Sequence, residues 1–152
     1  MSNALTDRRF GYAWVTFAAA LALHVTDEAT HDFLSTYNPS VLAIRARLPF
    51  LPLPTFTFGV WLTGLIAGIA LLFLLSSYAF RGALWLRIAS IPLSLLVGIG
   101  NACLHLSSSA YYHRWMPGVY SSPLLLAAAI LLLLAARKPQ PIASTSLAQQ
   151  RP

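Results

Sequence analysis

The chain has 152 residues, of which 57% are hydrophobic and only 9% carry a charge. This composition is that of a membrane protein and not of an ordinary soluble domain. The formal net charge of +6 comes from Lys and Arg residues that flank the hydrophobic runs, which indicates contact with anionic lipid head groups. No basic stripe with interleaved aromatic residues is present, so nucleic acid is excluded as a partner. The single cysteine, Cys103, can form no internal disulfide and belongs to no metal-binding spacing motif.

Four hydrophobic runs are each long enough to cross a bilayer as a helix of roughly 20 residues. Alternation of the β-barrel type is absent, so each run must satisfy its own backbone as a helix. The sequence therefore predicts an all-α, polytopic membrane protein, with a four-helix transmembrane bundle over residues 1–138 and no second domain. The tail, residues 139–152, is rich in Pro, Ser and Gln and is expected to be disordered. The four runs cover residues 11–34, 56–80, 84–107 and 119–136.

The distribution of Lys and Arg predicts the orientation of the bundle. Seven of these residues lie on the side of the two termini and of the loop between the second and third runs, and three lie on the opposite side. Both termini are therefore expected in the cytoplasm. The seven are Arg8, Arg9, Arg81, Arg87, Arg137, Lys138 and Arg151, and the three are Arg45, Arg47 and Arg114.

Ionisable residues gather near the end of the first run. On a helix, His24, Asp27, Glu28 and His31 fall within an arc of about 100° and so share one face, with Asp32 at its edge. Charged groups in a hydrophobic segment are costly, so a cluster of this kind is a functional-site hypothesis.

A second polar pair lies near the end of the third run, where Asn101 and His105 are four residues apart and share a helix face. The first and third helices of an alternating bundle run in the same direction. Both clusters should therefore meet at one depth, near the outer face of the membrane. His113 follows in the loop on that side, and we expect Asn101 and His113 to support the ligands of the site. The amphipathic segment at residues 41–48 can act as a lid over it.

Two or more histidines together with carboxylates offer the nitrogen and oxygen ligands that suit zinc or another divalent transition metal. His24, Glu28 and His105 are the first candidates as metal ligands, with His31 as a fourth. Three protein ligands and a water molecule form a hydrolytic arrangement. Asp27 and Glu28 are then the candidate catalytic carboxylates, with Asp27 as a base or as support for a ligand. A di-iron bundle needs the Glu-x-x-His pattern twice, whereas this chain has it once, at Glu28 and His31.

The same residues fit three functions, and the sequence leaves them open. The first is a membrane-embedded metal-dependent hydrolase of a lipid or another apolar small molecule. The second is a protein that binds an ion, a proton or a small ligand without catalysis. The third is an accessory subunit of a larger membrane complex, or a homo-oligomer, in which the cluster is a hydrogen-bonded network that fixes the helices.

Two blocks of the sequence stand out, His24-Val-Thr-Asp27-Glu28 and then Asn101-Ala-Cys-Leu-His105-Leu with Arg114-Trp-Met-Pro117-Gly118-Val-Tyr-Ser-Ser-Pro123-Leu-Leu. In the second block, a His near a helix end precedes an aromatic-x-Pro-Gly turn. Both blocks resemble the HXXEE family of small bacterial membrane proteins. Together with the order and spacing of the spans, the resemblance covers most of residues 11–136. It implies a multi-pass location in the bacterial inner membrane and draws attention to the same polar residues, but the family has no assigned activity to transfer. Asp27 stands where the signature has its first Glu.

Overall fold

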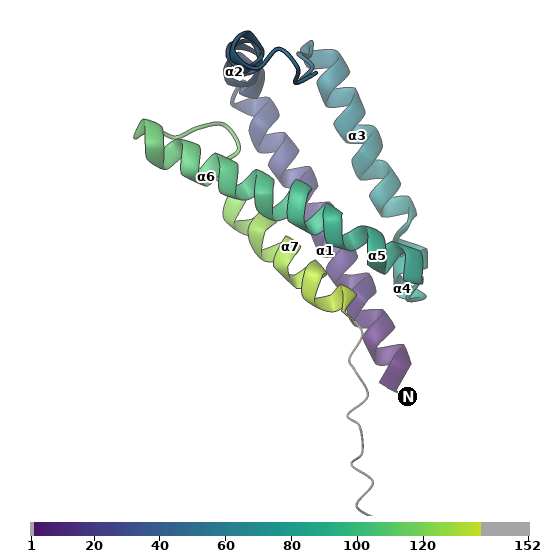
Figure 1. Cartoon of the computed structure of the whole chain (residues 1–152). Helices are drawn as coiled ribbons and strands as arrows, with labels where there is room; N and C mark the ends of the chain where they lie inside the picture. The colour runs from purple at the N-terminus through teal and green to yellow at the C-terminus, as the bar shows by residue number, and fades with distance from the viewer. Residues whose placement is uncertain (1, 138–152) are drawn as a thin grey trace, which may run out of the picture.

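The computed structural model describes residues 2–137, and every regular element in that range is a helix (Figure 1). The all-α prediction is therefore confirmed for this part of the chain, whereas the predicted disordered tail, residues 139–152, lies outside the described residues. The elements are α1 (Ser2–Thr30), α2 (Phe33–Arg47), α3 (Phe58–Leu74), α4 (Ser76–Phe80), α5 (Leu84–Pro92), the π-helix η1 (Leu93–Gly100), α6 (Asn101–Tyr112) and α7 (Ser122–Ala136).

Helix α1 forms the centre of the bundle, because α3, α4 and α7 all pack against it. Its large apolar residues recur at intervals of three and four, which places them along one face of the helix. That face and the inner face of α7 supply most of the core. The buried residues include Phe10, Trp14, Phe17, Leu21 and Val25 from α1 and Leu125, Ala129 and Leu132 from α7.

Helices α5, η1 and α6 follow one another as a single helical run. The π-helix begins directly after Pro92, which has no N–H to donate to an α-helical ladder. Within η1, Gly98 lies so close to α7 that a Cβ atom there would clash with Ala129. Because π-helical turns hold more residues than α-helical turns, η1 changes the direction in which the side chains of α6 point.

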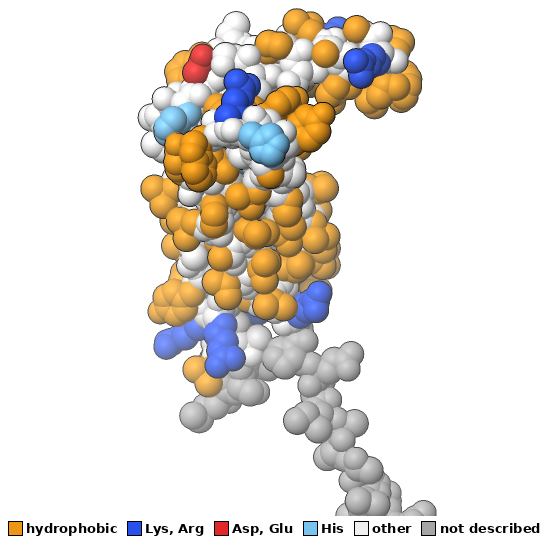
Figure 2. Space-filling model, turned by 90° about the vertical axis from the view of Figure 1, so that its left-hand side faces the viewer, with side chains coloured by type: hydrophobic (Ala, Val, Ile, Leu, Met, Phe, Trp, Pro, Cys, Tyr) orange, Lys and Arg blue, Asp and Glu red, His pale blue; other side chains and the backbone are white. Residues whose placement is uncertain are grey.

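Two helical runs are long and apolar enough to span a membrane, Phe58–Phe80 with 23 residues and Leu84–Tyr112 with 29 residues. Helix α7 is apolar but shorter, and α1, with 29 residues, carries the polar cluster. On length and composition, two of the four predicted spans therefore qualify as spans. Figure 2 shows hydrophobic side chains as a broad band across one face of the molecule, with Lys and Arg side chains above and below it.

The first predicted span, residues 11–34, is wrong at its C-terminal end, because α1 ends at Thr30. The Thr30 hydroxyl donates to the Thr26 carbonyl (2.8 Å), a bond that competes with the helical ladder. Asp32 then adopts a left-handed conformation with φ 52°, which Asp tolerates better than most residues do. The chain therefore turns before α2 begins.

The amphipathic segment predicted at residues 41–48 belongs to a longer helix, the 15-residue α2, which continues through Pro39. Two hydrogen bonds fix this helix to the segment that leads into α3. Asn38 Nδ2 donates to the Phe56 carbonyl (2.9 Å), and the Phe56 N–H donates to Asn38 Oδ1 (3.1 Å). Helix α2 thus lies across the top of the molecule in Figure 1, above α1 and beside the start of α3.

Candidate metal centre

Three buried side chains from two helices converge near the C-terminal end of α1. His24 and Glu28 lie one turn apart on α1, His105 lies on α6, and their relative exposures are 0%, 5% and 5%. Glu28 Oε1 lies 3.6 Å from His24 Nε2 and 2.9 Å from His105 Nε2. One ligand atom from each residue lies within 4.8 Å of the other two, so the group can hold a metal ion. We call these three residues the His–Glu–His group.

The donor set of the His–Glu–His group fits a cation. His105 Nε2 is buried, and its partner is Glu28 Oε1 at 2.9 Å, in a geometry that is not that of a hydrogen bond. The His24 and His105 rings are 4.9 Å apart between centroids and inclined at 75°, so their Nε2 atoms approach Glu28 from different sides. Two imidazole nitrogens and one carboxylate oxygen within 4.8 Å of one another are donors that a divalent cation can bind.

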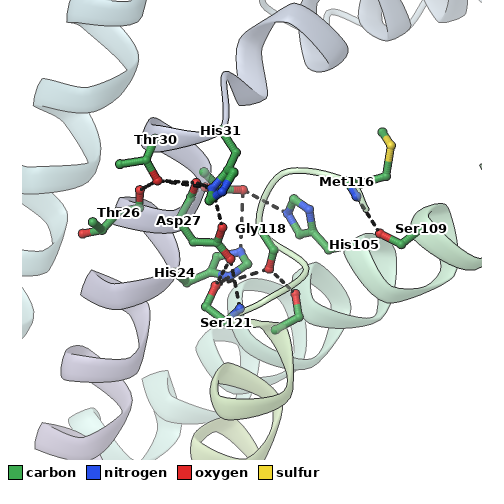
Figure 3. Close-up of polar contacts among 12 residues, drawn as sticks. His24, Thr26, Asp27, Thr30, His31, His105, Ser109, Met116, Gly118 and Ser121 are labelled. Atoms are coloured by element: carbon green, nitrogen blue, oxygen red, sulfur yellow. Dashed lines mark hydrogen bonds and ion pairs between the residues drawn. The ribbon is translucent and has the colours of Figure 1, made fainter. Parts of the chain in front are cut away.

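The turn between α6 and α7 closes over both imidazoles, as Figure 3 shows for the labelled residues. Gly118 has φ +84°, and a Cβ atom there would lie 2.8 Å from His105 Nδ1 and 3.1 Å from His24 Cε1. Only glycine combines that backbone conformation with such a close approach. The Pro117-Gly118 pair, which the sequence marks as a turn, is thus in direct contact with the site.

A chain of hydrogen bonds fixes the tautomer of His24. The Ser121 hydroxyl donates to Asp27 Oδ2 (2.7 Å), because an ionised carboxylate can only accept. His24 Nδ1, 2.9 Å from Ser121 Oγ, must therefore be the donor in that pair. The lone pair of His24 is then on Nε2, and Asn101 Nδ2 donates to this atom (3.0 Å), which agrees. His24 Nε2 also lies 3.6 Å from Glu28 Oε1, and a metal ion could bind this nitrogen only in place of the hydrogen bond from Asn101.

Asp27 lies beside the His–Glu–His group and not within it. The Ser121 N–H also donates to its Oδ2 (2.9 Å), and its Oδ1 lies 2.9 Å from His31 Nδ1. Hydrogen bonds of this kind, from a carboxylate through to a ligand histidine, orient metal ligands and tune their basicity. Of the two roles predicted for Asp27, its position fits support for a ligand better than a base.

Two predicted residues are not brought into the group. The side chain of His31 is 50% exposed and contacts Asp27, whose carbonyl accepts a bond from Nδ1 (2.8 Å). His113 is exposed at the end of α6, in a left-handed conformation with φ 50°. Asn101 contacts His24, but it donates to Nε2, the nitrogen that a metal would need, and not to Nδ1, the side on which a supporting residue would act.

Sequence reasoning missed Ser121. A serine just before a helix is ordinarily expected to be a cap, and Ser121 makes no side-chain cap bond at the start of α7. It links Asp27 to His24 instead. Nothing in the local pattern predicts this, because the partners lie 94 and 97 positions away in the sequence.

Comparisons with family models, with curated proteins and with solved structures gave no match for this chain. The function of the chain is therefore inferred from the residues of the site.

Proposed function

We propose that the chain is a multi-pass membrane protein whose four spans are α1, α3 with α4, α5 through α6, and α7, with both termini in the cytoplasm. Helix α3 supports this proposal, because none of its residues is buried and its large apolar side chains point in several directions. A helix that is apolar all round and still exposed suits a lipid surround. Its exposed residues include Phe58, Val60, Ile66, Leu71, Phe73 and Leu74.

Within this membrane protein, the His–Glu–His group is proposed to hold zinc or another divalent transition metal and to hydrolyse a lipid or another apolar small molecule. The convergence of three buried ligand atoms, from His24, Glu28 and His105, within 4.8 Å of one another is the observation that carries this proposal. Two imidazoles and one carboxylate are a ligand set of catalytic zinc sites, which leave one position open for water. Bound there, such an ion polarises a carbonyl and makes water acidic enough to react near neutral pH.

The residues of the chain divide the work in this proposal. Asp27, through Ser121, holds the His24 ring in one orientation and tautomer. Glu28 would supply, as a ligand, the negative charge that a divalent cation needs in apolar surroundings. Gly118 closes the turn over both imidazoles. The resemblance to the HXXEE family fits this division, since its two blocks contain all of these positions.

Hydrolysis of nitrophenyl esters by the protein in lipid nanodiscs tests the function. The proposal predicts turnover that a chelator abolishes and that added zinc or another divalent transition metal restores, whereas the His105→Ala variant stays inactive under both conditions. His113→Ala is the matched control, because His113 is exposed and outside the group. Turnover that survives both the chelator and the loss of His105 would overturn the proposal.

A second candidate is a non-enzymatic protein that handles protons or ions. The observation that favours it is the line of polar contacts from half-exposed His31 through Asp27 and Ser121 to fully buried His24. Proteoliposomes with an internal pH dye would show a flux that Ser121→Ala reduces. As an accessory subunit or homo-oligomer, the chain would place the exposed surface of α3 against another membrane protein, which crosslinking in the membrane would detect.

A further inference from the structure

A cavity of about 280 Å³ lies between α2, α6 and the turn before α7, and His105 forms part of its wall. One face of α2 provides much of the lining, with residues at helical spacing. The Phe33 ring lies 5.6 Å from the His105 ring between centroids, so this end of the cavity adjoins the His–Glu–His group. The apolar lining includes Phe33, Tyr37, Val41 and Ile44 from α2, Leu104 from α6 and Met116 from the turn.

We propose that this cavity binds the acyl chain of an ester or amide substrate, with the carbonyl group at the His105 end. The inference rests on the proposed hydrolase function and names its substrate class. Hydrolysis then adds water across the acyl C–O or C–N bond. The products are a carboxylic acid, whose chain occupies the cavity, and an alcohol or amine.

The chemistry of the lining supports an alkyl chain as the occupant. Among the described residues, the lining contains no Lys, Arg, Asp or Glu, and its hydroxyl groups come from Thr36, Tyr37, Ser40 and Ser108. Two of these hydroxyls are already used, because Ser40 donates to the Thr36 carbonyl (2.7 Å) and Tyr37 to the Pro54 carbonyl (3.1 Å). The cavity therefore offers apolar contact along its length and one ionisable imidazole at its end.

The shape of the cavity indicates that it holds a single acyl chain. Phe33 and Ile44 are separated by roughly 16 Å along a helix that rises about 1.5 Å per residue. A volume of about 280 Å³ is small for a cavity that follows this face, and it lies below the usual range for drug-sized ligands. A long cavity of small volume is narrow, which fits one extended chain and excludes the whole of a two-chain lipid.

The cavity is also preformed, because α2, which lines one side of it, is held in place. Two hydrogen bonds between Asn38 and Phe56 hold α2 in place, and the Tyr37 ring stacks on the Phe56 ring at 6.0 Å between centroids. A wall held in this way needs no rearrangement to bind a chain, which reduces the entropic cost of binding.

Photolabelling in nanodiscs tests the proposal, with a decanoic acid that carries a diazirine near its methyl end. We expect the label on lining residues such as Val41, Ile44 or Met116. Ile44→Trp, which fills the cavity from a partly exposed position, should reduce this labelling about tenfold. Leu71→Trp on lipid-exposed α3 is the matched control and should leave it unchanged. Label confined to α3, or equal labelling of the wild type and Ile44→Trp, would overturn the proposal.

A second experiment distinguishes binding of the acyl chain in the cavity from the proposed hydrolase activity. Decanoyl and acetyl nitrophenyl esters are compared in the wild type and in Ile44→Trp. The proposal predicts that Ile44→Trp loses decanoyl turnover and keeps acetyl turnover. Equal loss or retention of the two activities contradicts the acyl-chain assignment while the hydrolase stands. Specific labelling of the cavity without turnover of either ester leaves the chain-binding cavity in place and rejects the hydrolase.

Discussion

The two ends of α1 each hold a buried ionisable cluster, and the two clusters are built differently. At the N-terminal end, Arg87 Nη2 donates to Asp7 Oδ1 (2.8 Å) and Nη1 donates to the Ala135 carbonyl (2.8 Å). The guanidinium also lies 4.4 Å from the centroid of the Phe10 ring, although its Nε makes no hydrogen bond. At the C-terminal end, the Glu28 carboxylate contacts two imidazoles and, within residues 2–137, forms no ion pair with a Lys or Arg side chain.

The two clusters differ in whether they contain a permanent cation, and this difference indicates a different role for each. Arginine carries a permanent charge, so the Arg87 cluster already contains the cation that its carboxylate needs and acts as a lock between α1, α5 and α7. The His–Glu–His group has a carboxylate and two nitrogens that can direct lone pairs at one point, and its cation is proposed to be a metal. The contribution to unfolding free energy should therefore depend on bound metal for the cluster at the C-terminal end of α1 and not for the cluster at its N-terminal end.

The largest effect is expected from the ligands themselves. His24→Ala and His105→Ala should each bring metal binding below detection, because a site with three protein ligands tolerates the loss of none. Each variant should also unfold more readily, since Glu28 then lacks both a cation and one imidazole. Metal titration of the purified variants checks this, with His113→Ala as the control that retains binding. Binding of wild-type strength in His105→Ala would reject the shared site.

The Arg87 cluster should give a large effect on stability and none on metal. Arg87→Met keeps much of the side-chain volume but leaves Asp7 without its partner. We expect a loss of about 3 kcal/mol in unfolding free energy, the low end for a broken buried pair, because the Asp7 side chain is 33% exposed. Denaturation in detergent with and without chelator measures it. If the chelator changed the effect of Arg87→Met, the two clusters would not be independent.

A smaller effect is expected at the link between Asp27 and His24. Ser121→Ala should weaken metal binding about 10–100-fold, because loss of the group that orients a ligand typically costs this much. Nitrogen-15 NMR of the metal-free variant should show His24 in a mixture of tautomers, in place of the single Nδ1–H form of the wild type. Ser121→Thr should restore both, since it returns the hydroxyl.

Ser122→Ala is the matched control for the link between Asp27 and His24. Ser122 is the next residue, it is buried, and its hydroxyl donates to the Gly118 carbonyl (2.7 Å) and to neither Asp27 nor His24. Equal losses of affinity in Ser121→Ala and Ser122→Ala would mean that the serines act through packing alone.

The smallest effect is expected from Asp27→Asn. The amide oxygen can still accept from Ser121, so metal is retained and affinity falls by about tenfold or less. Hydrolysis should also fall, because the His24 ligand becomes less basic. In a protein where the cluster is only a structural network, the same change removes a partly buried charge, leaves metal content unaltered and stabilises the fold. Metal affinity and unfolding free energy, measured on the same preparation, distinguish the two outcomes.

The sequence predicted the core of this site because its geometry is local. His24 and Glu28 share a face through the period of one helix, and His105 comes to the same depth because the first and third helical runs are parallel. The structure brings these three side chains together. His113 lies outside the His–Glu–His group, because it ends α6 in a left-handed conformation just before the turn that leads to α7.

What the sequence could not predict depends on contacts between distant segments. Residues 30–32 are the polar run Thr-His-Asp, but nothing in that run encodes the left-handed conformation of Asp32 that separates α1 from α2. The π-helix after Pro92 is stabilised where Gly98 meets Ala129 on another helix, and no periodicity in the sequence encodes that contact. The role of Ser121 likewise exists only once α7 lies against α1.

The most direct test of the central claim is the metal content of the wild-type protein, purified without chelator and measured by mass spectrometry of the elements. The proposed metal centre predicts about one divalent metal ion per chain in the wild type and in His113→Ala, and none in His105→Ala. Content well below one ion per chain, with no uptake when zinc is added to the folded protein, would contradict the metal centre.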